Sequence, residues 1–177
     1  LQALAFYDEG LVPTLDFPER LRAQGRERLR ARGLRGPPVA VHPGSGSPSK
    51  NWPVERFVEI IRRLRAKHSE VVAILGEADV AEAAVLAREL PDLPVLEGLT
   101  LVELAATLAE CRAYLGNDSG ITHLAAAVGL PVTALFGPSD ADVWAPRGRG
   151  GAKVLRAPEG ELERLAVAAV WESLENA

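Results

Sequence analysis

The chain has 177 residues, of which 47% are hydrophobic and 25% charged, and its formal net charge is −4. This length and composition are typical of a single domain with a proper core, and the mild acidity argues against nucleic acid as the main partner. No apolar stretch reaches the length needed to span a bilayer. Cys111 is the only cysteine, so no internal disulfide is expected, which fits a reducing cytoplasm.

The N-terminal part is predicted to connect this domain to another one. Residues 1–18 show no clear hydrophobic period and are interpreted as a connector. Residues 18–32 form a highly charged helix candidate, which the Gly-Pro-Pro sequence at 36–38 brings to an end. We therefore expect a connector and linker helix over residues 1–36, and a second unit over residues 37–177 that includes a C-terminal helix.

From residue 39 onward, short apolar segments alternate with amphipathic ones, and these predict strands and helices respectively. The predicted strands are 39–41, 71–75, 95–96, 113–116, 132–136 and 153–155. The predicted helices begin near residues 53, 79, 100 and 119, and a last one covers about 161–174. Continuous apolar strands that alternate with amphipathic helices indicate an α/β fold, a doubly wound parallel sheet covered on both faces (Rossmann-like).

Two of these helices begin with residue pairs typical of a capping box. Asp79 and Glu82 form one such pair, and Thr100 with Glu103 forms the other. The helix that follows Thr100 is expected to bury Leu101, Leu104, Ala105 and Leu108.

The most informative stretch is Gly-Asn-Asp-Ser-Gly-Ile-Thr-His at 116–123, where a predicted strand leads into a helix. Asp118 or Ser119 can cap this helix, which leaves its first backbone N–H groups free to face an anion. Gly120 has no side chain to obstruct that face, and His123 follows about one turn later. Ligands of open α/β sheets bind at such junctions. From the residues alone, an ordinary helix cap with a hydrogen-bonded histidine is slightly favoured.

The loop 42–50 is the second candidate segment. Its two glycines allow backbone amides to approach a phosphate, Ser45 adds a hydroxyl, and Lys50 adds a positive charge. It is no P-loop, because no Gly-Lys-Ser/Thr closes it, and no dinucleotide fingerprint, because Ser49 stands where the third glycine belongs. Composition alone favours a flexible turn with an exposed lysine.

These motifs resemble a known family when they are taken together. Asp-Ser-Gly-x-x-His, then Leu-Ala-Ala-Ala-x-Gly-x-Pro and Ala-Leu-Phe-Gly-Pro, at 118–138, resemble the ADP-heptose:lipopolysaccharide heptosyltransferases, glycosyltransferase family 9. His-Pro-Gly-Ser-Gly at 42–46, followed by Lys50, Trp52 and Pro53, is similar to that family's other signature. The resemblance runs from about residue 39 to 138 and covers the family's C-terminal half.

The resemblance implies the nucleotide-sugar-binding half of an inverting GT-B glycosyltransferase. An acceptor hydroxyl attacks the anomeric carbon of an ADP-linked heptose, and Lys50 with the amides of helix 119–129 stabilises the leaving diphosphate without a metal ion. The general base belongs to the family's N-terminal half, so no base is assigned in this chain. The implied substrate-binding residues are Ser45, Gly46, Lys50, Glu77, Leu99, Asp118, Ser119, Gly120 and His123.

Two loops are expected to complete the pocket. Leu99 occupies the position where the family places an apolar contact to the nucleobase, and plain core packing is an equal alternative. Glu77 is a candidate to accept ribose hydroxyls, with Asp79 as a rival. No cofactor and no metal are predicted, because Asp140-Ala141-Asp142 lies in a turn-rich segment and is interpreted as surface. Trp52 and Trp144 are expected to be packing residues that hold their loops.

Other functions stay open from the sequence. The residues do not predict a hydrolase, because Ser119 is misplaced for a Gly-x-Ser-x-Gly elbow, and Asp118, Ser119 and His123 are too local for a triad. A stand-alone nucleotide-binding module and half of a sugar-nucleotide epimerase remain as alternatives. An epimerase should supply several acids and bases near the sugar, and this chain offers little beyond His123.

The expected partners follow from the resemblance. They are a nucleotide-diphosphate sugar donor and, through an N-terminal domain missing from this chain, a lipid-linked saccharide acceptor. No nucleic acid and at most peripheral membrane contact are expected. The expected location is the cytoplasm, at the inner face of the membrane.

Overall fold

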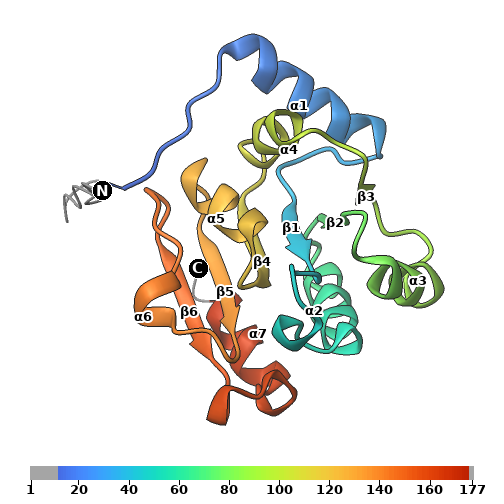
Figure 1. Cartoon of the computed structure of the whole chain (residues 1–177). Coiled ribbons are helices and arrows are strands. Elements are labelled where there is room, and N and C mark those ends of the chain that lie inside the picture. The colour runs from blue at the N-terminus through green and yellow to red at the C-terminus, as the bar shows by residue number, and fades with distance from the viewer. Residues whose placement is uncertain (1–11, 176–177) are drawn as a thin grey trace, which may run out of the picture.

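The computed structural model describes residues 12–175 and contains a six-stranded sheet (Figure 1). Its strands are β1 (Val39–His42), β2 (Val71–Ile74), β3 (Val95–Leu96), β4 (Ala113–Asn117), β5 (Val132–Phe136) and β6 (Ala152–Arg156). They lie in the order β3-β2-β1-β4-β5-β6, and every neighbouring pair is parallel. The predicted doubly wound parallel sheet is confirmed. The first eleven residues of the expected connector lie outside the described part.

Seven α-helices occur within the described residues, of which α1 precedes the first strand, α7 follows the last one and the others lie between strands. They are α1 (Glu19–Ala31), α2 (Val54–Ala66), α3 (Val80–Glu89), α4 (Leu101–Leu108), α5 (Gly120–Ala127), α6 (Ala141–Trp144) and α7 (Val167–Glu175). Short 3-10 turns occur at Pro48–Lys50, Pro158–Gly160 and Leu162–Arg164.

The two faces of the sheet are covered by different helices. One core cluster joins Phe57 and Ile61 of α2, Leu86 of α3 and Val170 of α7 to sheet residues such as Val41. The opposite cluster packs α1, α4, α5 and α6 on the other side chains of the same strands, through Leu29, Leu104, Leu108, Ala125, Ala126 and Ala141. Burial on both faces explains why the strands are apolar at nearly every position.

The strand order reverses between β1 and β4, and this reversal positions the candidate site. β1 pairs with β2 on one side and with β4 on the other, so the loops that leave β1 and β4 diverge to opposite directions. Ligands of open α/β sheets bind in the crevice at such a switch point, outside the carboxyl ends of the strands. The segments 44–50, 76–79, 97–99 and 118–123 all follow strands that run the same way, so they share this edge, as expected.

The predicted last helix is wrong in its first part. Residues 162–164 form a 3-10 turn, Leu165 is extended, and α7 begins only at Val167. The carbonyl of Leu165 accepts hydrogen bonds from the Trp52 indole at 2.9 Å and from Arg56 at 2.7 Å. Because this carbonyl serves tertiary contacts, it is unavailable to a helix hydrogen-bond series.

One of the two predicted capping boxes is wrong. At α4, Thr100 and Glu103 exchange their hydrogen bonds as expected. At α3, the Asp79 side chain makes no capping bond, and Glu82 instead accepts from Asn51. Leu101 is 67% exposed, so the expected buried stripe is wrong there, because the first turn of α4 extends beyond the core.

Candidate functional site

The loop after β1 is held at both ends by one buried amide, that of Asn117 at the end of β4. Its Oδ1 accepts from the backbone N–H of Trp52 at 3.0 Å, and its Nδ2 donates to the carbonyl of Pro43 at 2.7 Å. Trp52 is fully buried, which confirms its predicted packing role. Trp144 is 59% exposed, so the same prediction is wrong for that residue.

The hydrogen bonds of Asn117 bring the loop 42–50 into contact with the segment 116–123. The Lys50 ammonium lies 2.7 Å from Oδ2 of Asp118. The Asp118 side chain is 8% exposed, whereas that of Lys50 is 37% exposed. The lysine is therefore directed to the end of β4 while its charge stays within reach of a ligand.

The start of α5 is capped by Ser119, one of the two residues that the sequence left open. Its Oγ accepts from the backbone N–H of Thr122 at 3.3 Å. The first N–H groups of a helix have no intrahelical partner, and Gly120 is the first residue of α5. A Cβ atom built on Gly120 would meet no atom within 4 Å. The start of α5 is therefore open to an approaching anion.

The β1 loop presents a second open backbone segment. A Cβ atom on Gly46 would also meet nothing within 4 Å, and this glycine is exposed. Ser45 is partly buried, and its hydroxyl donates to the carbonyl of Ser47 at 2.7 Å. The serine therefore shapes the turn, and the glycine leaves the backbone accessible.

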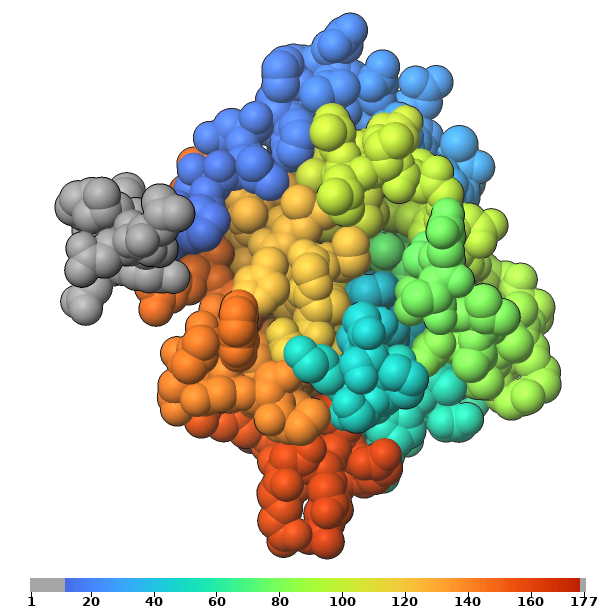
Figure 2. All heavy atoms as spheres, in the orientation of Figure 1, coloured from blue at the N-terminus to red at the C-terminus, as the bar shows by residue number. Residues whose placement is uncertain are grey.

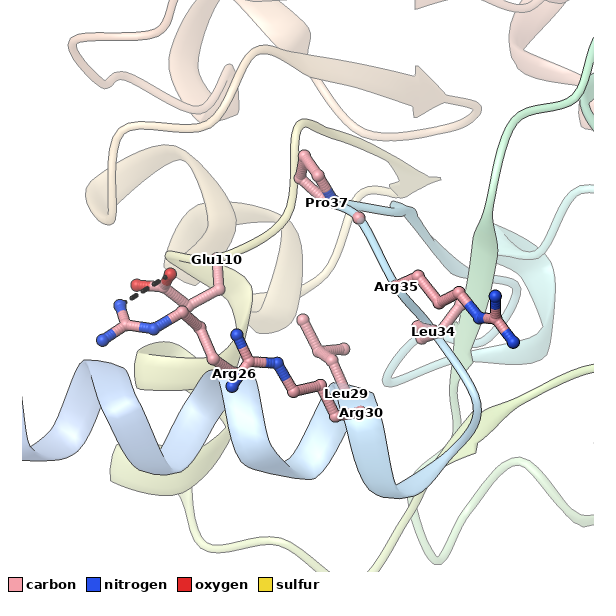
Figure 3. Close-up of a pocket in the computed structure, with 8 residues that line it drawn as sticks. Arg26, Leu29, Arg30, Leu34, Arg35, Pro37 and Glu110 are labelled. Carbon is pink, nitrogen blue, oxygen red and sulfur yellow. Dashed lines mark hydrogen bonds and ion pairs between the residues drawn. The ribbon is translucent and has the colours of Figure 1, made fainter.

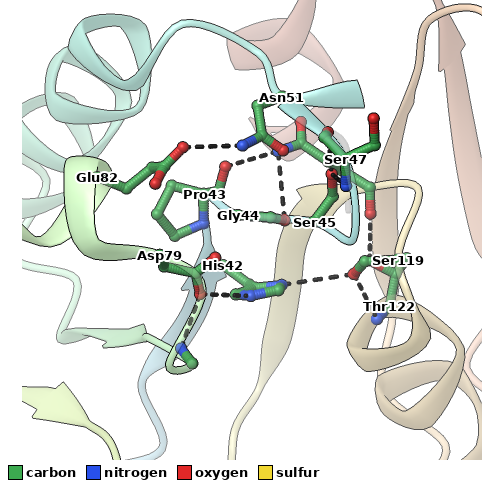
Figure 4. A network of polar contacts seen from close by, with 12 residues as sticks. His42, Pro43, Gly44, Ser45, Ser47, Asn51, Asp79, Glu82, Ser119 and Thr122 are labelled. Atoms are coloured by element: carbon green, nitrogen blue, oxygen red, sulfur yellow. Dashed lines mark hydrogen bonds and ion pairs between the residues drawn. The ribbon is translucent and has the colours of Figure 1, made fainter. Parts of the chain in front are cut away.

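A buried histidine ties three of these loops together (Figure 4). Nε2 of His42 lies 3.2 Å from Oδ2 of Asp79, and Nδ1 lies 3.4 Å from Oγ of Ser119. Asp79 also accepts from the N–H of Gly76 at 2.7 Å. Burial favours the neutral acid, but the bonds from His42 and Gly76 outweigh it and hold the pKa of Asp79 below its usual value.

Gly44 and Asp79 fit closely. A Cβ atom on Gly44 would lie 1.7 Å from Oδ1 of Asp79. Gly44 therefore makes room for the buried carboxylate, a reason different from the phosphate approach expected from the sequence. Since Asp79 is 4% exposed and already hydrogen-bonded, it is a poorer candidate for ribose hydroxyls than the exposed Glu77.

A cavity of about 410 Å³ lies beside this network. Figure 2 shows the surface hollowed between the gold α5, the cyan loop after β1 and the green segments that follow β2 and β3. Its lining includes His42, Gly76, Glu77, Gly98, Leu99 and Ile121. Leu99 both packs against the core and lines the cavity, so its core packing is confirmed and its contact with a nucleobase stays a prediction. Known ligand pockets measure roughly 300–1,000 Å³.

The remaining predicted site residues are found as follows. His123 is partly buried on α5, and within the described part of the chain no group is hydrogen-bonded to its ring. Asp140 caps α6, and Asp142 pairs with Arg156. No cluster of three metal-ligating side chains occurs in residues 12–175, and no helix described there is long and apolar enough to cross a membrane.

A second hollow lies at the other end of the molecule, where α1 meets the loop that precedes β1 (Figure 3). It measures about 230 Å³, and its lining includes Arg26, Arg30, Leu34, Arg35 and Glu110. None of the predicted site residues lies there. Three of its lining residues are arginines, so an anion attracted by positive charge alone could bind in this hollow as well.

Sequence reasoning missed the residues that organise the site. Asn117 and Thr122 were within the most informative stretch, yet neither was given a role. A signal was available for Asn117, because an amide directly at the end of an apolar strand needs partners when it is buried. Asp79 was misassigned because its spacing to Glu82 is also that of a capping box.

The parallel sheet, its covering helices and the loops at its switch point define a Rossmann-like α/β architecture. The family model "Glycosyltransferase family 9 (heptosyltransferase)" matches residues 4–166. The chain therefore belongs to glycosyltransferase family 9, the heptosyltransferase family.

Two curated relatives illustrate the similarity. The chain is 30% identical to lipopolysaccharide heptosyltransferase 3 of Escherichia coli K12 over 151 residues, which are 82% of this chain and 44% of the relative. It is 35% identical to lipopolysaccharide heptosyltransferase 2 of Salmonella typhimurium over 118 residues, 62% of this chain and 34% of the relative. The chain thus spans less than half the length of these relatives.

Solved structures show the same fold. The glycosyl transferase family 9 structure from Veillonella parvula superposes with a TM-score of 0.84 and 25% identity, covering 98% of this chain and 56% of that one. The Escherichia coli ADP-heptose lps heptosyltransferase II gives 0.79 and 28%, covering 94% and 53%. Escherichia coli heptosyltransferase WaaC with ADP gives 0.73 and 26%, covering 86% and 48%.

The lowered pKa of Asp79 predicts a pH-dependent contribution to stability. An aspartate titrates at about 3.9 in unfolded chains, so its stabilising effect is present above that value and is lost as the pH falls through the lower folded value. The difference in unfolding free energy between wild type and Asp79→Asn should therefore shrink below about pH 4. Urea denaturation from pH 3 to 7 measures it.

The matched control for this experiment is Glu55→Gln, on the exposed side of α2. Its pH profile should follow the wild type. A wild-type advantage over Asp79→Asn that stays constant down to pH 3 would contradict the assigned ionisation of Asp79.

Proposed function

We propose that this chain is the nucleotide-sugar-binding half of an inverting glycosyltransferase that transfers heptose from ADP-heptose to a lipopolysaccharide core acceptor. The observation that carries the proposal is the contact between Lys50 and Asp118 at the switch point, beside the open start of α5 and the 410 Å³ cavity. We propose that the diphosphate of the donor binds at the start of α5 and that its nucleoside binds in the cavity beside it.

The diphosphate is proposed to bind between Lys50 and the first N–H groups of α5. The positive end of a helix dipole favours a phosphate, and Lys50 adds a compact positive charge. Asp118 holds the ammonium in place, so an arriving diphosphate shares Lys50 with that carboxylate. Because the chain is net acidic, such local positive groups must supply the electrostatic affinity.

The nucleoside is proposed to occupy the neighbouring cavity. Leu99 and Ile121 supply apolar surface for the base. Glu77 is exposed at the same cavity and offers acceptor oxygens to ribose hydroxyls. Ser45 and Gly46 are proposed to face the phosphates from the β1 loop.

The reaction is proposed to follow the inverting scheme. The acceptor hydroxyl attacks the anomeric carbon, the bond from that carbon to the ADP oxygen breaks, and the electron pair leaves with ADP. Lys50 and the α5 amides stabilise the negative charge that grows on the diphosphate. Asp118, Ser119, Gly120 and His123 are proposed to line the diphosphate and sugar positions. The hydroxyl's proton goes to a base that we assign to the family's N-terminal half.

We also propose separate roles for the two parts of the chain. Residues 37–177 form the donor-binding unit, and residues 1–36 lead to it from the half that is proposed to bind the lipid-linked acceptor. The enzyme is proposed to work in the cytoplasm at the inner face of the membrane. Relatives named as lipopolysaccharide heptosyltransferases support a lipopolysaccharide acceptor.

The two alternative functions, an epimerase half and a stand-alone nucleotide-binding module, would require different residues. A sugar-nucleotide epimerase needs several acids and bases around the sugar, and the described residues offer little beyond His123 at that position. A stand-alone nucleotide-binding module would bind ADP as the proposed half does. Glycosyl transfer by this chain alone would overturn the assignment of the base to another half.

Removing the Lys50 charge should weaken nucleotide binding. A charge-assisted contact contributes roughly 1.5–3 kcal/mol, so Lys50→Ala should lower ADP affinity about ten- to a hundredfold. Calorimetric titration of ADP measures the change.

Two variants serve as controls for the loss of a positive charge. Lys67→Ala removes an ammonium that pairs with Glu175, and Arg35→Ala removes a guanidinium from the hollow at α1. Both should bind ADP as the wild type does. Equal affinities of Lys50→Ala and wild type would show that Lys50 does not touch the phosphates.

Gly120→Ala tests the open start of α5 without removing a charge. Because the added methyl group meets no atom within 4 Å, folding stability should be unchanged or higher by up to about 1 kcal/mol. The methyl group narrows the path of an anion to the backbone, so ADP affinity should fall roughly tenfold. Thermal unfolding and ADP titration together measure both effects. Undiminished affinity would place the phosphates elsewhere.

A further inference from the structure

The loops at the carboxyl edge of the sheet follow one another in the order in which the parts of a nucleotide are joined. β4, β1, β2 and β3 are consecutive neighbours in the sheet (Figure 1). The start of α5 follows β4, Lys50 follows β1, Glu77 follows β2, and Glu97 follows β3. Neighbouring strands lie about 4.8 Å apart, so three spacings, about 14 Å, separate β4 from β3. A nucleotide with its diphosphate at β4 and β1 and its nucleoside in the 410 Å³ cavity therefore has its ribose near β2 and its base near β3.

Two polar side chains of the cavity lining are occupied by bonds within the fold. The ring of His42 contacts Asp79 at 3.2 Å and Ser119 at 3.4 Å. The hydroxyl of Thr100 donates to the Glu103 carboxylate at 2.8 Å and accepts from the backbone N–H of the same residue at 3.3 Å. Neither side chain is therefore available to recognise a base.

Glu77 and Glu97 are the polar lining side chains that remain. Both are exposed, and neither makes a hydrogen bond or an ion pair with another residue of the described range 12–175. The other lining residues are apolar or glycine. An ionised carboxylate accepts hydrogen bonds and donates none. The side chains that are free to bind a ligand here thus favour groups that donate.

Glu97, rather than Glu77, lies with the apolar surface proposed for the base. It follows β3 directly, and Leu99 is the second residue after it. Gly98 between them has a φ of 66°, in the left-handed region that glycine adopts readily, and the residues on both sides of this turn line the cavity. Glu77 follows β2, one strand closer to the phosphates. The order of the strands therefore assigns Glu77 to the ribose and Glu97 to the base.

We propose that Glu97 is a specificity-determining residue, whose carboxylate accepts a hydrogen bond from the exocyclic amino group of the donor's nucleobase. The inference rests on the proposed function, in which the nucleoside of ADP-heptose occupies this cavity. The amino group of adenine donates hydrogen bonds, whereas guanine and thymine present a carbonyl oxygen at the corresponding position. Such an oxygen would face the carboxylate as a second acceptor. Glu97 therefore favours adenine over those bases.

The exposure of Glu97 sets the size of the expected effect. A buried polar group that is left without its partner rejects a ligand analogue strongly. An exposed carboxylate instead stays hydrated when the amino group of the ligand is missing. We therefore expect the amino group to raise the affinity about three- to tenfold.

A comparison of two nucleotides measures this contact. Purine riboside 5′-diphosphate lacks only the 6-amino group of ADP, so the ratio of the two dissociation constants isolates that group. Calorimetric titration of the wild type should give a preference for ADP of about three- to tenfold, and Glu97→Ala should reduce it to about one. Glu97→Gln keeps an oxygen that accepts hydrogen bonds, so this variant should retain part of the preference. Removal of a negative charge affects both diphosphates alike and cancels in the ratio.

Glu77→Ala is the matched control, because it removes the other unpaired carboxylate of the same cavity. Its preference for ADP over purine riboside diphosphate should equal that of the wild type. With 2′-deoxy-ADP, which lacks one ribose hydroxyl, the two variants exchange roles. The preference for ADP over 2′-deoxy-ADP should shrink in Glu77→Ala and persist in Glu97→Ala. A general distortion of the cavity would not produce this crossed pattern.

The results separate this inference from the proposed function. If the wild type binds ADP but shows no preference over purine riboside diphosphate, the role of Glu97 is overturned while the proposed function stands. The same holds if Glu97→Ala keeps the wild-type preference. A wild type that binds neither nucleotide would overturn the proposed function and this inference with it. Thermal unfolding of Glu97→Ala should match the wild type, because the exposed side chain has no hydrogen bond or ion pair to lose within residues 12–175.

Discussion

The side-chain amide of Asn117 is the contact on which the candidate site depends. It lies at the end of β4, where the strand order reverses, and it bonds to the backbone on both sides of the β1 loop. A buried amide left without partners costs about 1–3 kcal/mol, so the loop has one favourable position. That position puts Lys50 beside Asp118 and the start of α5.

The charges of the site are arranged in two pairs of different accessibility. His42 and Asp79 are buried beneath the loops and hold them together. Lys50 and Asp118 lie at the edge, and the Lys50 side chain is partly exposed. A buried pair positions the backbone, whereas a partly exposed lysine can exchange its partner for a phosphate. The same few loops thus combine a buried pair that holds the backbone with a partly exposed lysine that a ligand can reach.

Much of the fold followed from the sequence, because apolar strands and amphipathic helices have distinct periods. The site was predicted only in part. Lys50, Asp118 and Ser119 were predicted as site residues from motifs that resemble a known family, and the structure places these three residues together. The roles of Asn117 and Asp79 were missed, because they depend on contacts between segments far apart in the chain. The break before α7 was missed for the same reason, since the carbonyl of Leu165 serves Trp52.

A crystal structure of this chain with ADP tests the central claim most directly. The account predicts the diphosphate within hydrogen-bonding distance of the Gly120 N–H and the Lys50 ammonium, with the adenine in the cavity beside Leu99. ADP bound in the basic hollow at α1, or an empty switch point at saturating ADP, would contradict it.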